Sequence, residues 1–528
     1  MKPNGPYPYY DIENINNLKE MLEAKNEKCP NKIAISFMQN GEKISKTYGE
    51  VYHDVEMLSG YFYKNYKLKH IALIGENSYN WLVTFLSIII SGNVCVIIDK
   101  DVTKDKFKQL LKISESNAVF YSEKYCTFIK DMLFIKKNKI DDLTKYYKAG
   151  AKVENKHVIE NDKPAAIFFT SGTTGPNKAV VLSQKNMAFD LIAASSLYEP
   201  QKNPRGTVVC FLPFHHAFGL ITSVLMAYNY EEKIYLNSSL KNITKDLKEN
   251  SPDTLFAVPI FIETFYKQIW KNARSKHREK ILKATIRLSN SLLKVGIDKR
   301  KFFFKSILNE FGGNLSYIIC GGAYLDKKYV KWFRSIGIEI LNGYGITECS
   351  PVVSVNRNFH VKDGSVGIAC KGVSVKIIDG EICVSGDNVM LGYYKDLKAT
   401  NTVIKDGYFH TGDLGYIDED GFIFITGRKK NLIILSNGEN ISPEVIEAYL
   451  MKDEAVCEVI VYAKDNKIVA QIYPTEDYIG DQEYFDNLIY KYNQDKPKNS
   501  QIAYVILRTE EFEKNTNKKI LRDKVGKE

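Results

Sequence analysis

The feature that most limits the possible fold is a repeated alternation of short apolar runs with longer stretches of helical spacing. The runs are rich in β-branched and aromatic side chains and occupy residues 71–75, 94–98, 165–169, 208–212 and 317–320. Continuous apolar runs of this length are typical of strands buried on both faces, as in parallel sheets covered by helices. The pattern therefore predicts an α/β fold over most of the chain.

The pattern changes in the last third of the chain. Between residues 373 and 425, short alternating strands are separated by glycine-containing turns, which predicts a β-rich subdomain over about 350–429. After Lys430, a strand-like segment precedes a helix start, with Ser442 as the N-cap and Pro443 at the first helical position. A chain of 528 residues is longer than one hydrophobic core usually serves. We therefore expect an N-terminal domain over 1–429 and a compact α+β domain over 430–528.

Composition excludes several classes of protein. With 44% hydrophobic and 26% charged residues, the chain is globular and not fibrous or disordered. The net charge of +10 is spread without a dense basic block, which indicates a solvated surface; attraction of nucleotides is compatible with it, but nucleic-acid binding is not indicated. The nine cysteines form no C-x-x-C pair, and no signal peptide precedes them, so we expect reduced thiols in a cytoplasmic protein, without a disulfide or zinc site.

One apolar segment resembles a membrane span in length. It runs over 81–98, but Gly92 and Asn93 divide it into a helix-length part and a β-branched part. We therefore predict a buried helix followed by a buried strand, and no transmembrane segment.

The strongest local motif is a loop rich in glycine and hydroxyl residues that follows the strand at 165–169. It reads Thr170-Ser171-Gly172-Thr173-Thr174-Gly175-Pro176-Asn177-Lys178. Backbone N–H groups, hydroxyls and a lysine at a strand end can converge on phosphate oxygens. The loop is not a Walker motif, because Asn177 stands where the second glycine belongs. Taken alone, such a cluster can also be an ordinary surface loop.

Together with later segments, this loop resembles the superfamily of acyl- and aryl-CoA synthetases, luciferases and nonribosomal-peptide adenylation domains. The resemblance covers nearly the whole chain and rests on segments in the family's order, at 171–179, 212–219, 320–323, 342–348, 408–413, 426–430, 436–443 and 516–522. Three departures are visible: the loop proline is displaced by one place, Ala179 replaces a glycine, and Lys518 replaces the glycine of the terminal motif. The resemblance implies a large adenylation domain with a small β-barrel subdomain and a mobile C-terminal lid.

The resemblance also implies a nucleotide site. An aromatic face and close backbone approach suit adenine, and Tyr344 aligns with the family's adenine-stacking tyrosine. A carboxylate can accept both ribose hydroxyls, as implied for Asp413, with Arg428 beside it. Glu348, with Thr174, is implied to hold Mg²⁺ between the phosphates. The full implied set is Thr170, Ser171, Gly172, Thr173, Thr174, Lys178, Gly321, Gly322, Ala323, Asn342, Gly343, Tyr344, Gly345, Thr347, Asp413, Arg428, Lys430 and Gly438.

Four further residues receive roles from the same resemblance. His216 aligns with a histidine near the acyl carboxylate, although a structural histidine is an open alternative. Lys519 aligns with the lysine that bridges the carboxylate and the α-phosphate. Lys430 aligns with the pivot between two half-reactions, and Gly438 lies in the loop that lines the thiol tunnel.

The implied activity is activation of a carboxylic acid to an acyl-AMP, followed by transfer to coenzyme A. The segment 211–220 is apolar apart from two histidines, and no aspartate there could bind an amino group, so an uncharged acyl or aryl acid is favoured over an amino acid. The spacing between Arg428 and the segment 436–443 is like that of long-chain acyl-CoA synthetases, which favours a fatty acid. Two alternatives stay open: a ligase that loads a separate carrier protein, and a non-catalytic nucleotide-binding scaffold on the same fold.

Overall fold

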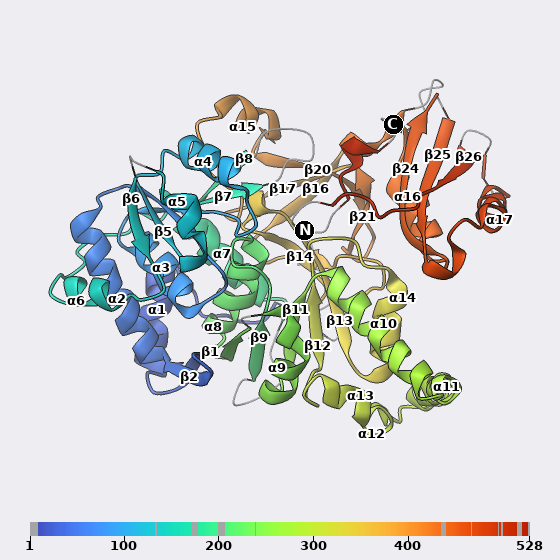
Figure 1. The fold of residues 1–528 in the computed structure, drawn as a ribbon, viewed down its shortest axis with the longest axis horizontal. Helices are drawn as coiled ribbons and strands as arrows, with labels where there is room; N and C mark the ends of the chain where they lie inside the picture. The colour runs from blue at the N-terminus through green and yellow to red at the C-terminus, as the bar shows by residue number, and fades with distance from the viewer. Residues whose placement is uncertain are drawn as a thin grey trace.

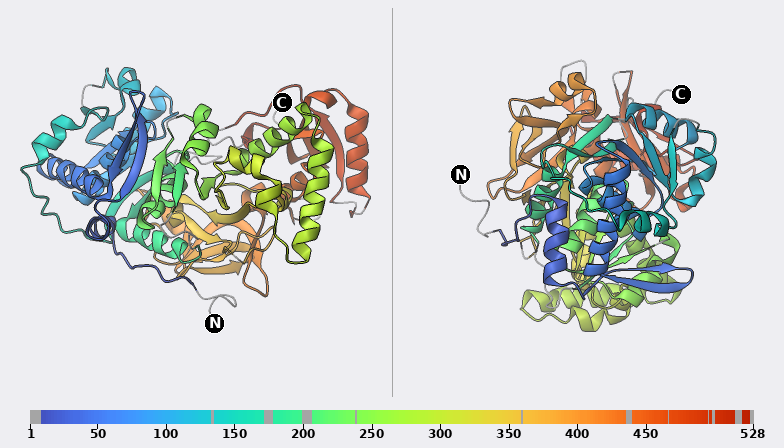
Figure 2. Two further views of the ribbon diagram at one scale, coloured as in Figure 1. Left: turned by 90° about the horizontal axis from the view of Figure 1, so that it is seen from below. Right: turned by 90° about the vertical axis from the view of Figure 1, so that its left-hand side faces the viewer.

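The structure is a computed structural model that describes residues 9–132, 135–170, 178–198, 206–237, 239–358, 360–434, 440–465, 467–494, 496–497, 500–514 and 520–525. Its N-terminal elements and its C-terminal elements lie at opposite ends of the molecule (Figures 1 and 2). Figure 1 labels the elements used below.

Two large sheets form the framework. The seven-stranded sheet has the order β18 (Gly392–Tyr393), β8 (Lys178–Ser183), β7 (Pro164–Thr170), β4 (Val94–Ile97), β3 (His70–Ile74), β5 (Ala118–Tyr121) and β6 (Lys136–Lys139). The nine-stranded sheet has the order β15 (Ile368–Ala369), β14 (Val352–Val355), β13 (Glu339–Gly345), β12 (Tyr317–Cys320), β11 (Thr254–Ala257), β9 (Thr207–Cys210), β10 (Lys233–Leu236), β1 (Ile33–Gln39) and β2 (Glu42–Thr47). The strands in the middle of both sheets pair in parallel, and the antiparallel pairs lie towards the edges.

Helices cover these sheets, as the alternating sequence pattern predicts (Figure 1). They are α1 (Leu18–Lys28), α2 (Tyr48–Asn65), α3 (Tyr79–Ile90), α4 (Lys104–Ile113), α5 (Cys126–Ile129), α6 (Thr144–Gly150), α7 (Gln184–Ser195), the π-helix η2 (Phe218–Leu225), α8 (Met226–Asn229), α9 (Ile243–Asn250), α10 (Pro259–Ser275), α11 (Glu279–Lys294), α12 (Arg300–Phe303), α13 (Lys305–Glu310) and α14 (Lys327–Ile336). Short 3₁₀ turns η1 (Glu123–Tyr125), η3 (Leu240–Asn242) and η4 (Thr347–Cys349) connect them.

The apolar segment over 81–98 forms a buried helix and a buried strand, as expected. Helix α3 is buried along almost its whole length and is capped by Ser78, whose hydroxyl accepts from the backbone N–H of Trp81. Gly92, at φ +81°, turns the chain into β4. Within the described residues, none of the helices combines the length and apolarity needed to span a membrane.

The predicted β-rich subdomain is a five-stranded antiparallel sheet. Its order is β16 (Ser374–Ile378), β17 (Glu381–Ser385), β20 (Tyr408–Ile417) and β19 (Ile404–Lys405), with β21 (Ile423–Arg428) also on β20 and α15 (Leu397–Val403) beside it. In one detail it differs from the expected barrel: among the described strands no pairing closes the sheet, because β19 and β21 both pair with β20 and leave β16 at an edge.

A second, smaller core follows residue 430. It contains η5 (Lys429–Asn431), β22 (Ile433–Ile434), β23 (Asn440–Ile441), α16 (Pro443–Leu450), β24 (Val456–Lys464), β25 (Lys467–Pro474), η6 (Glu476–Tyr478), α17 (Gln482–Asn493), β26 (Ile502–Leu507) and η8 (Arg522–Lys524). Its apolar residues form a cluster separate from that of the large sheets. The α/β fold with a smaller α+β part is therefore confirmed, whereas the domain boundary at residue 430 stays a prediction.

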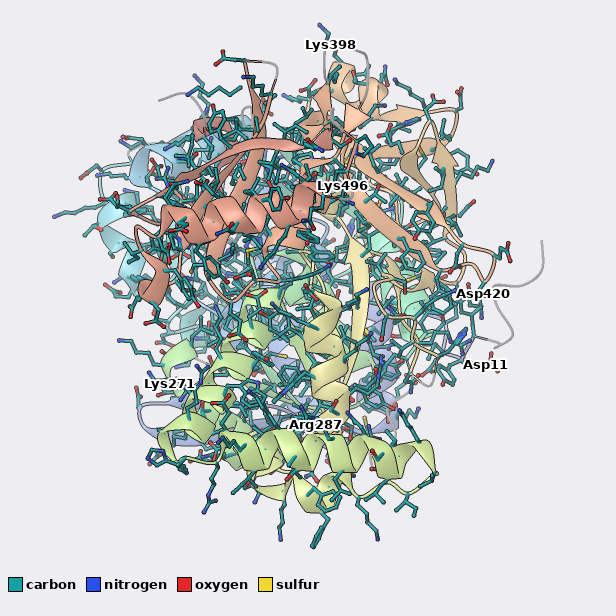
Figure 3. All side chains as sticks on the ribbon, turned by 90° about the vertical axis from the view of Figure 1, so that its right-hand side faces the viewer. Asp11, Lys271, Arg287, Lys398, Asp420 and Lys496 are labelled. Carbon is teal, nitrogen blue, oxygen red and sulfur yellow. The ribbon has the colours of Figure 1, made fainter. Side chains whose placement is uncertain are left out.

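Charged side chains cover the outside of the molecule in both signs. Lys271, Arg287, Lys398 and Asp420 project from separate elements on the face that Figure 3 shows, and all four are exposed. This dispersed arrangement agrees with the interpretation of the net charge as a solvated surface.

Candidate active site

A cavity of about 2460 Å³ opens where the two large sheets, the five-stranded sheet and the C-terminal core meet. Its wall includes the carboxyl ends of several strands, at Ile97, Thr170, Cys320 and Gly345. Ligand sites of open α/β sheets lie at the carboxyl ends of parallel strands, because the loops that follow the strands converge there. The cavity is therefore the place to examine the predicted residues.

Every predicted site residue that the structure describes lines this cavity. They are Thr170, Lys178, His216, Gly321, Gly322, Ala323, Asn342, Gly343, Tyr344, Gly345, Thr347, Glu348, Asp413, Arg428 and Lys430. The remaining predicted residues, Ser171, Gly172, Thr173, Thr174, Gly438 and Lys519, lie outside the described residues. Segments far apart in the sequence are thus brought to one wall, while the role of each residue stays a prediction.

At one end of the cavity, a carboxylate joins two strands of the five-stranded sheet to the nine-stranded sheet. Asp413 on β20 accepts a hydrogen bond from the Tyr344 hydroxyl on β13 at 2.7 Å, and its other oxygen lies 2.7 Å from Arg428 Nε on β21. Asp413 and Arg428 are register partners in the sheet, which explains the pairing. Burial and the Asp413 charge hold the pKa of Tyr344 well above its usual range, so the phenol stays a donor.

The wall beside Tyr344 contains a polar atom that is unpaired within the described residues. The Asn342 Oδ1 atom is buried and has no hydrogen-bond partner in the described part of the chain, which makes it an acceptor awaiting a donor. The chain is closely packed at two glycines of this wall: a Cβ at Gly345 would lie 2.0 Å from the Pro351 carbonyl, and one at Gly321 would lie 3.3 Å from the Phe218 ring. The Asn342 Oδ1 atom can therefore accept a hydrogen bond from a ligand in the cavity that it lines.

A second polar cluster lies towards the loop at 170–178. The Tyr393 hydroxyl donates to Glu348 Oε1 at 2.9 Å, and Lys178 Nζ donates to the Tyr393 hydroxyl at 3.4 Å while lying 4.5 Å from its ring centre. Burial and the Glu348 charge raise the pKa of Tyr393, so this hydroxyl too stays protonated. Within the described residues the second Glu348 oxygen accepts no hydrogen bond, so it is available to a donor or to a hard cation.

The two histidines of the segment 212–219 differ in environment. His215 is buried, its Nε2 lies 3.2 Å from Asp99 Oδ1, and burial together with the neighbouring His216 holds its pKa well below the usual range. His215 is therefore neutral, and like His216 it lines the cavity. His216 is less buried and faces the cavity, with its ring centre 4.3 Å from that of His215. Asn77 holds the turn before them through the Leu212 carbonyl at 2.7 Å and the Phe214 N–H at 3.0 Å.

The C-terminal core contributes to the same cavity. An ion pair between Arg522 and the partly buried Glu447 of α16 fixes the segment that begins at Ile520, and all three residues line the cavity. Ser442 begins α16 as predicted, but its hydroxyl donates to the Thr426 carbonyl at 2.8 Å instead of capping the helix. That bond ties α16 to β21 across the expected hinge.

Sequence reasoning missed Tyr393, Asp99 and Glu447. Tyr393 follows Gly392 in a two-residue strand too short for a periodic signal, and only the pairing of β18 with β8 brings it to Glu348. Asp99 follows the strand β4, so an acidic residue at the end of an apolar run was the available signal. Glu447 looks like an ordinary polar residue of an amphipathic helix.

Fold and cavity together define an α/β enzyme with a large ligand cavity that both the large α/β part and the small α+β part line. A sequence profile described as "AMP-binding enzyme" matches residues 22–394, well over half of the chain, and the chain belongs to that family. The predicted family is thus confirmed.

Two relatives and one solved structure illustrate the similarity. The long-chain-fatty-acid–CoA ligase FadD15 of Mycobacterium bovis is 28% identical over 424 residues, covering 74% of this chain and 70% of the relative. A chloroplastic long-chain-fatty-acid–[acyl-carrier-protein] ligase, AEE15 of Arabidopsis thaliana, is 26% identical over 499 residues, covering 76% and 68%. O-succinylbenzoate coenzyme A synthetase of Bacillus subtilis, in complex with ATP and magnesium ion, has a TM-score of 0.75 at 19% identity, covering 96% of this chain and 98% of the other.

Proposed function

We propose that this protein is an ATP-dependent acid–thiol ligase that converts a fatty acid to an acyl-AMP and then transfers the acyl group to coenzyme A. One observation carries the proposal: a single cavity is lined both by the Tyr344–Asp413–Arg428 cluster and by an apolar wall next to His216. The similarity to long-chain-fatty-acid–CoA ligases supports the choice of acid.

The nucleotide end binds and orients ATP. The Asn342 Oδ1 accepts from the adenine amine, the Tyr344 ring packs on the base, and the Asp413 carboxylate accepts the ribose hydroxyls. Arg428 and Tyr344 fix that carboxylate from two sides, so its orientation is set before the nucleotide arrives.

The phosphate end neutralises charge. Attack of a carboxylate on the α-phosphate brings two anions together, so the site must supply positive charge and alignment. Lys178, with Thr170 and the loop at 171–174, holds the phosphates, and Glu348 with Thr174 holds Mg²⁺. The ion, when bound, offsets the phosphate charge. Tyr393 orients Glu348 through the 2.9 Å hydrogen bond.

The acid end is apolar. The cavity that His216 lines is also lined by side chains of α7, η2, α8 and β11, namely Ala194, Phe218, Met226 and Phe256. These four side chains carry no charge and suit an acyl chain, whereas carboxylates of the lining such as Asp99, Asp101 and Glu263 belong to other elements. His216 lies where this lining meets the polar cluster and would position the carboxylate.

The C-terminal core supplies the last charge. Lys519 precedes Ile520, which lines the cavity, and the Arg522–Glu447 pair anchors that segment. Lys519 would bridge the carboxylate and the α-phosphate during adenylation. Rotation about Lys430 would then replace it with the loop that contains Gly438 and admit the thiol.

The test is pyrophosphate exchange into ATP with a panel of fatty, aryl and amino acids, followed by addition of coenzyme A. We expect exchange that depends on a fatty acid and on Mg²⁺, and an acyl-CoA product once the thiol is added. No exchange with any acid, despite measurable ATP binding, would favour the non-catalytic scaffold instead.

A second candidate is a ligase that loads an acyl carrier protein. This candidate is supported by the similarity to an acyl-carrier-protein ligase over 76% of this chain. Exchange without acyl-CoA formation, combined with acylation of a phosphopantetheine-bearing carrier protein, would identify this acceptor.

A further inference from the structure

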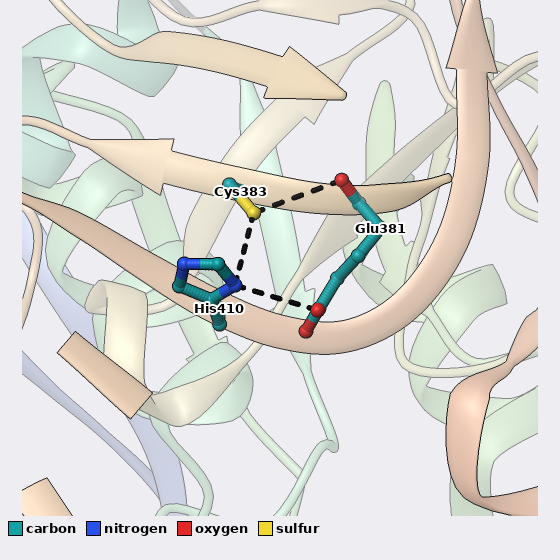
Figure 4. Close-up of side chains that lie close together, drawn as sticks. All are labelled: Glu381, Cys383 and His410. Atoms are coloured by element: carbon teal, nitrogen blue, oxygen red, sulfur yellow. Dashed lines mark hydrogen bonds and ion pairs between the residues drawn. The ribbon is translucent and has the colours of Figure 1, made fainter. Parts of the chain in front are cut away.

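Three side chains of different chemistry converge on the inner strands of the five-stranded sheet, beside the cavity (Figure 4). Glu381 and Cys383 are two residues apart on β17 and so point to the same face of the sheet. His410 on β20 is the register partner of Cys383, which brings the imidazole to the same face. The sheet pairing therefore assembles a carboxylate, a thiol and an imidazole.

The distances suit one tetrahedral metal ion. His410 Nδ1 lies 3.4 Å from Cys383 Sγ and 3.4 Å from Glu381 Oε2, and the ligand atoms of the three residues all lie within 4.8 Å of one another. Bond lengths of about 2.0 to 2.3 Å to zinc place tetrahedral ligand atoms roughly 3.3 to 3.8 Å apart. Two of the three separations fall in this range, and the third, which is at most 4.8 Å, would shorten if the three atoms coordinate one ion.

The surroundings resemble a supported ligand set. Glu381 and Cys383 are buried, and the Gly412 N–H donates to Glu381 Oε1 at 2.8 Å, which fixes the carboxylate and leaves Oε2 turned towards His410. Such hydrogen bonds to a ligand's second atom orient it for the metal. Burial and the Glu381 charge raise the pKa of Cys383 to about 11, so the thiol is neutral without a metal and loses its proton when a metal binds.

A cation already neutralises the carboxylate in this structure. Lys429 Nζ lies 2.9 Å from Glu381 Oε2, the oxygen that a metal ion would use. One oxygen cannot hold an ammonium and a metal ion at the same position, because the two like charges would repel at contact distance. Lys429 immediately precedes Lys430, the expected pivot, in the turn η5.

We propose that Glu381, Cys383 and His410 form a site for one borderline transition-metal ion of the zinc class, and that this ion and Lys429 compete for Glu381. Thiolate and imidazole ligands select such ions over Mg²⁺ and Ca²⁺. The competition is reciprocal. Metal binding therefore releases Lys429 from Glu381, and conformations that hold Lys429 on Glu381 lower the affinity for the metal ion. Both the metal site and its competition with Lys429 are independent of the proposed function.

Cysteine spacing alone could not reveal this site. Cys383 and His410 are 27 positions apart and meet only through the pairing of β17 with β20. The sequence expectation of no zinc site considered only C-x-x-C spacing.

The test titrates Zn²⁺, and in parallel Co²⁺, into the purified full-length protein without nucleotide or Mg²⁺, in competition with a chromophoric chelator. We expect one ion per chain and, with Co²⁺, a thiolate charge-transfer absorption. Cys383→Ser should abolish the absorption and weaken affinity by at least roughly tenfold, and His410→Asn should weaken it similarly. The matched control is Cys457→Ser, since Cys457 lies outside the cluster in β24.

The competition has its own variant. Lys429→Met removes the competing ammonium and should tighten Zn²⁺ binding several-fold, with the fold checked by circular dichroism. Absence of stoichiometric binding, or binding that Cys383→Ser and His410→Asn both leave unchanged, overturns the site. Unchanged or weaker binding by Lys429→Met overturns the competition. Since His410 is only partly buried, its variant decides the question even if Cys383→Ser fails to fold.

Discussion

Replacing Asp413 by asparagine tests the nucleotide site with the smallest change in shape. The native carboxylate accepts from Tyr344 at 2.7 Å and pairs with Arg428 at 2.7 Å, and we propose that it also accepts both ribose hydroxyls. Asparagine offers one acceptor oxygen and turns an NH₂ group towards the other partners. One charge-assisted bond to the ribose is therefore lost.

The magnitude follows from that loss. A hydrogen bond to a charged group contributes roughly 1.5 to 3 kcal/mol, which corresponds to about 10- to 150-fold in the dissociation constant of ATP. The cost to folding is smaller. The Arg428 side chain is 44% exposed, so its ion pair is screened and contributes at most about 1 kcal/mol.

The assay is calorimetric titration with ATP and Mg²⁺, together with the KM for ATP in pyrophosphate exchange. Asp418→Asn is the matched control, because Asp418 follows the same strand β20 and pairs with Lys362 instead of lining the cavity. We expect the control to bind ATP normally. An Asp413→Asn protein that is folded and binds ATP within twofold of wild type would refute the assignment of the ribose site, as would an equal loss in the control.

Four further predictions concern single residues. Asn342→Ala removes the buried acceptor for adenine and should weaken ATP binding by about 1 kcal/mol, or roughly fivefold, in the same titration. Glu348→Gln should raise the Mg²⁺ concentration needed for half-maximal exchange by roughly 10- to 100-fold or more, because mutating even a residue that only supports a metal ligand costs that much metal affinity. An unchanged Mg²⁺ requirement would exclude Glu348 as a ligand. Lys519→Ala should slow adenylation by roughly two to three orders of magnitude yet spare thioester formation from supplied acyl-AMP, which single-turnover kinetics measures. His215 has a depressed pKa in the folded state, so below about pH 6.5 the unfolded chain binds a proton that the folded chain does not, and the free energy of unfolding falls as the pH drops. Urea unfolding at two pH values should show a loss approaching 1.4 kcal/mol per pH unit. His215→Gln should remove this pH dependence, and the same change at the exposed His53 should leave it in place.

Much of the fold could be predicted because its signals are local. Apolar runs with no polar face predicted the strands β3, β4, β7, β9 and β12, and the two residues Gly92 and Asn93 correctly divided α3 from β4. A pattern of this kind depends only on a few neighbouring residues and on burial, so a strand can be predicted from it even when its partner strand is unknown. Pairing order and sheet closure are not local, and the expected barrel is an open sheet among the described strands for that reason.

The candidate site shows the same division. The sequence by itself carried the motifs of the family resemblance, and that resemblance implied that Tyr344, Asp413 and Arg428, which all line the cavity, belong to one site. Only the tertiary structure decided that Tyr393 orients Glu348, that Ser442 bonds to Thr426 instead of capping its helix, and that Glu381 holds Lys429 beside a thiol and an imidazole. Hydrogen bonds and ion pairs act over about 3 Å, and strand pairing, not spacing along the chain, sets which side chains come that close.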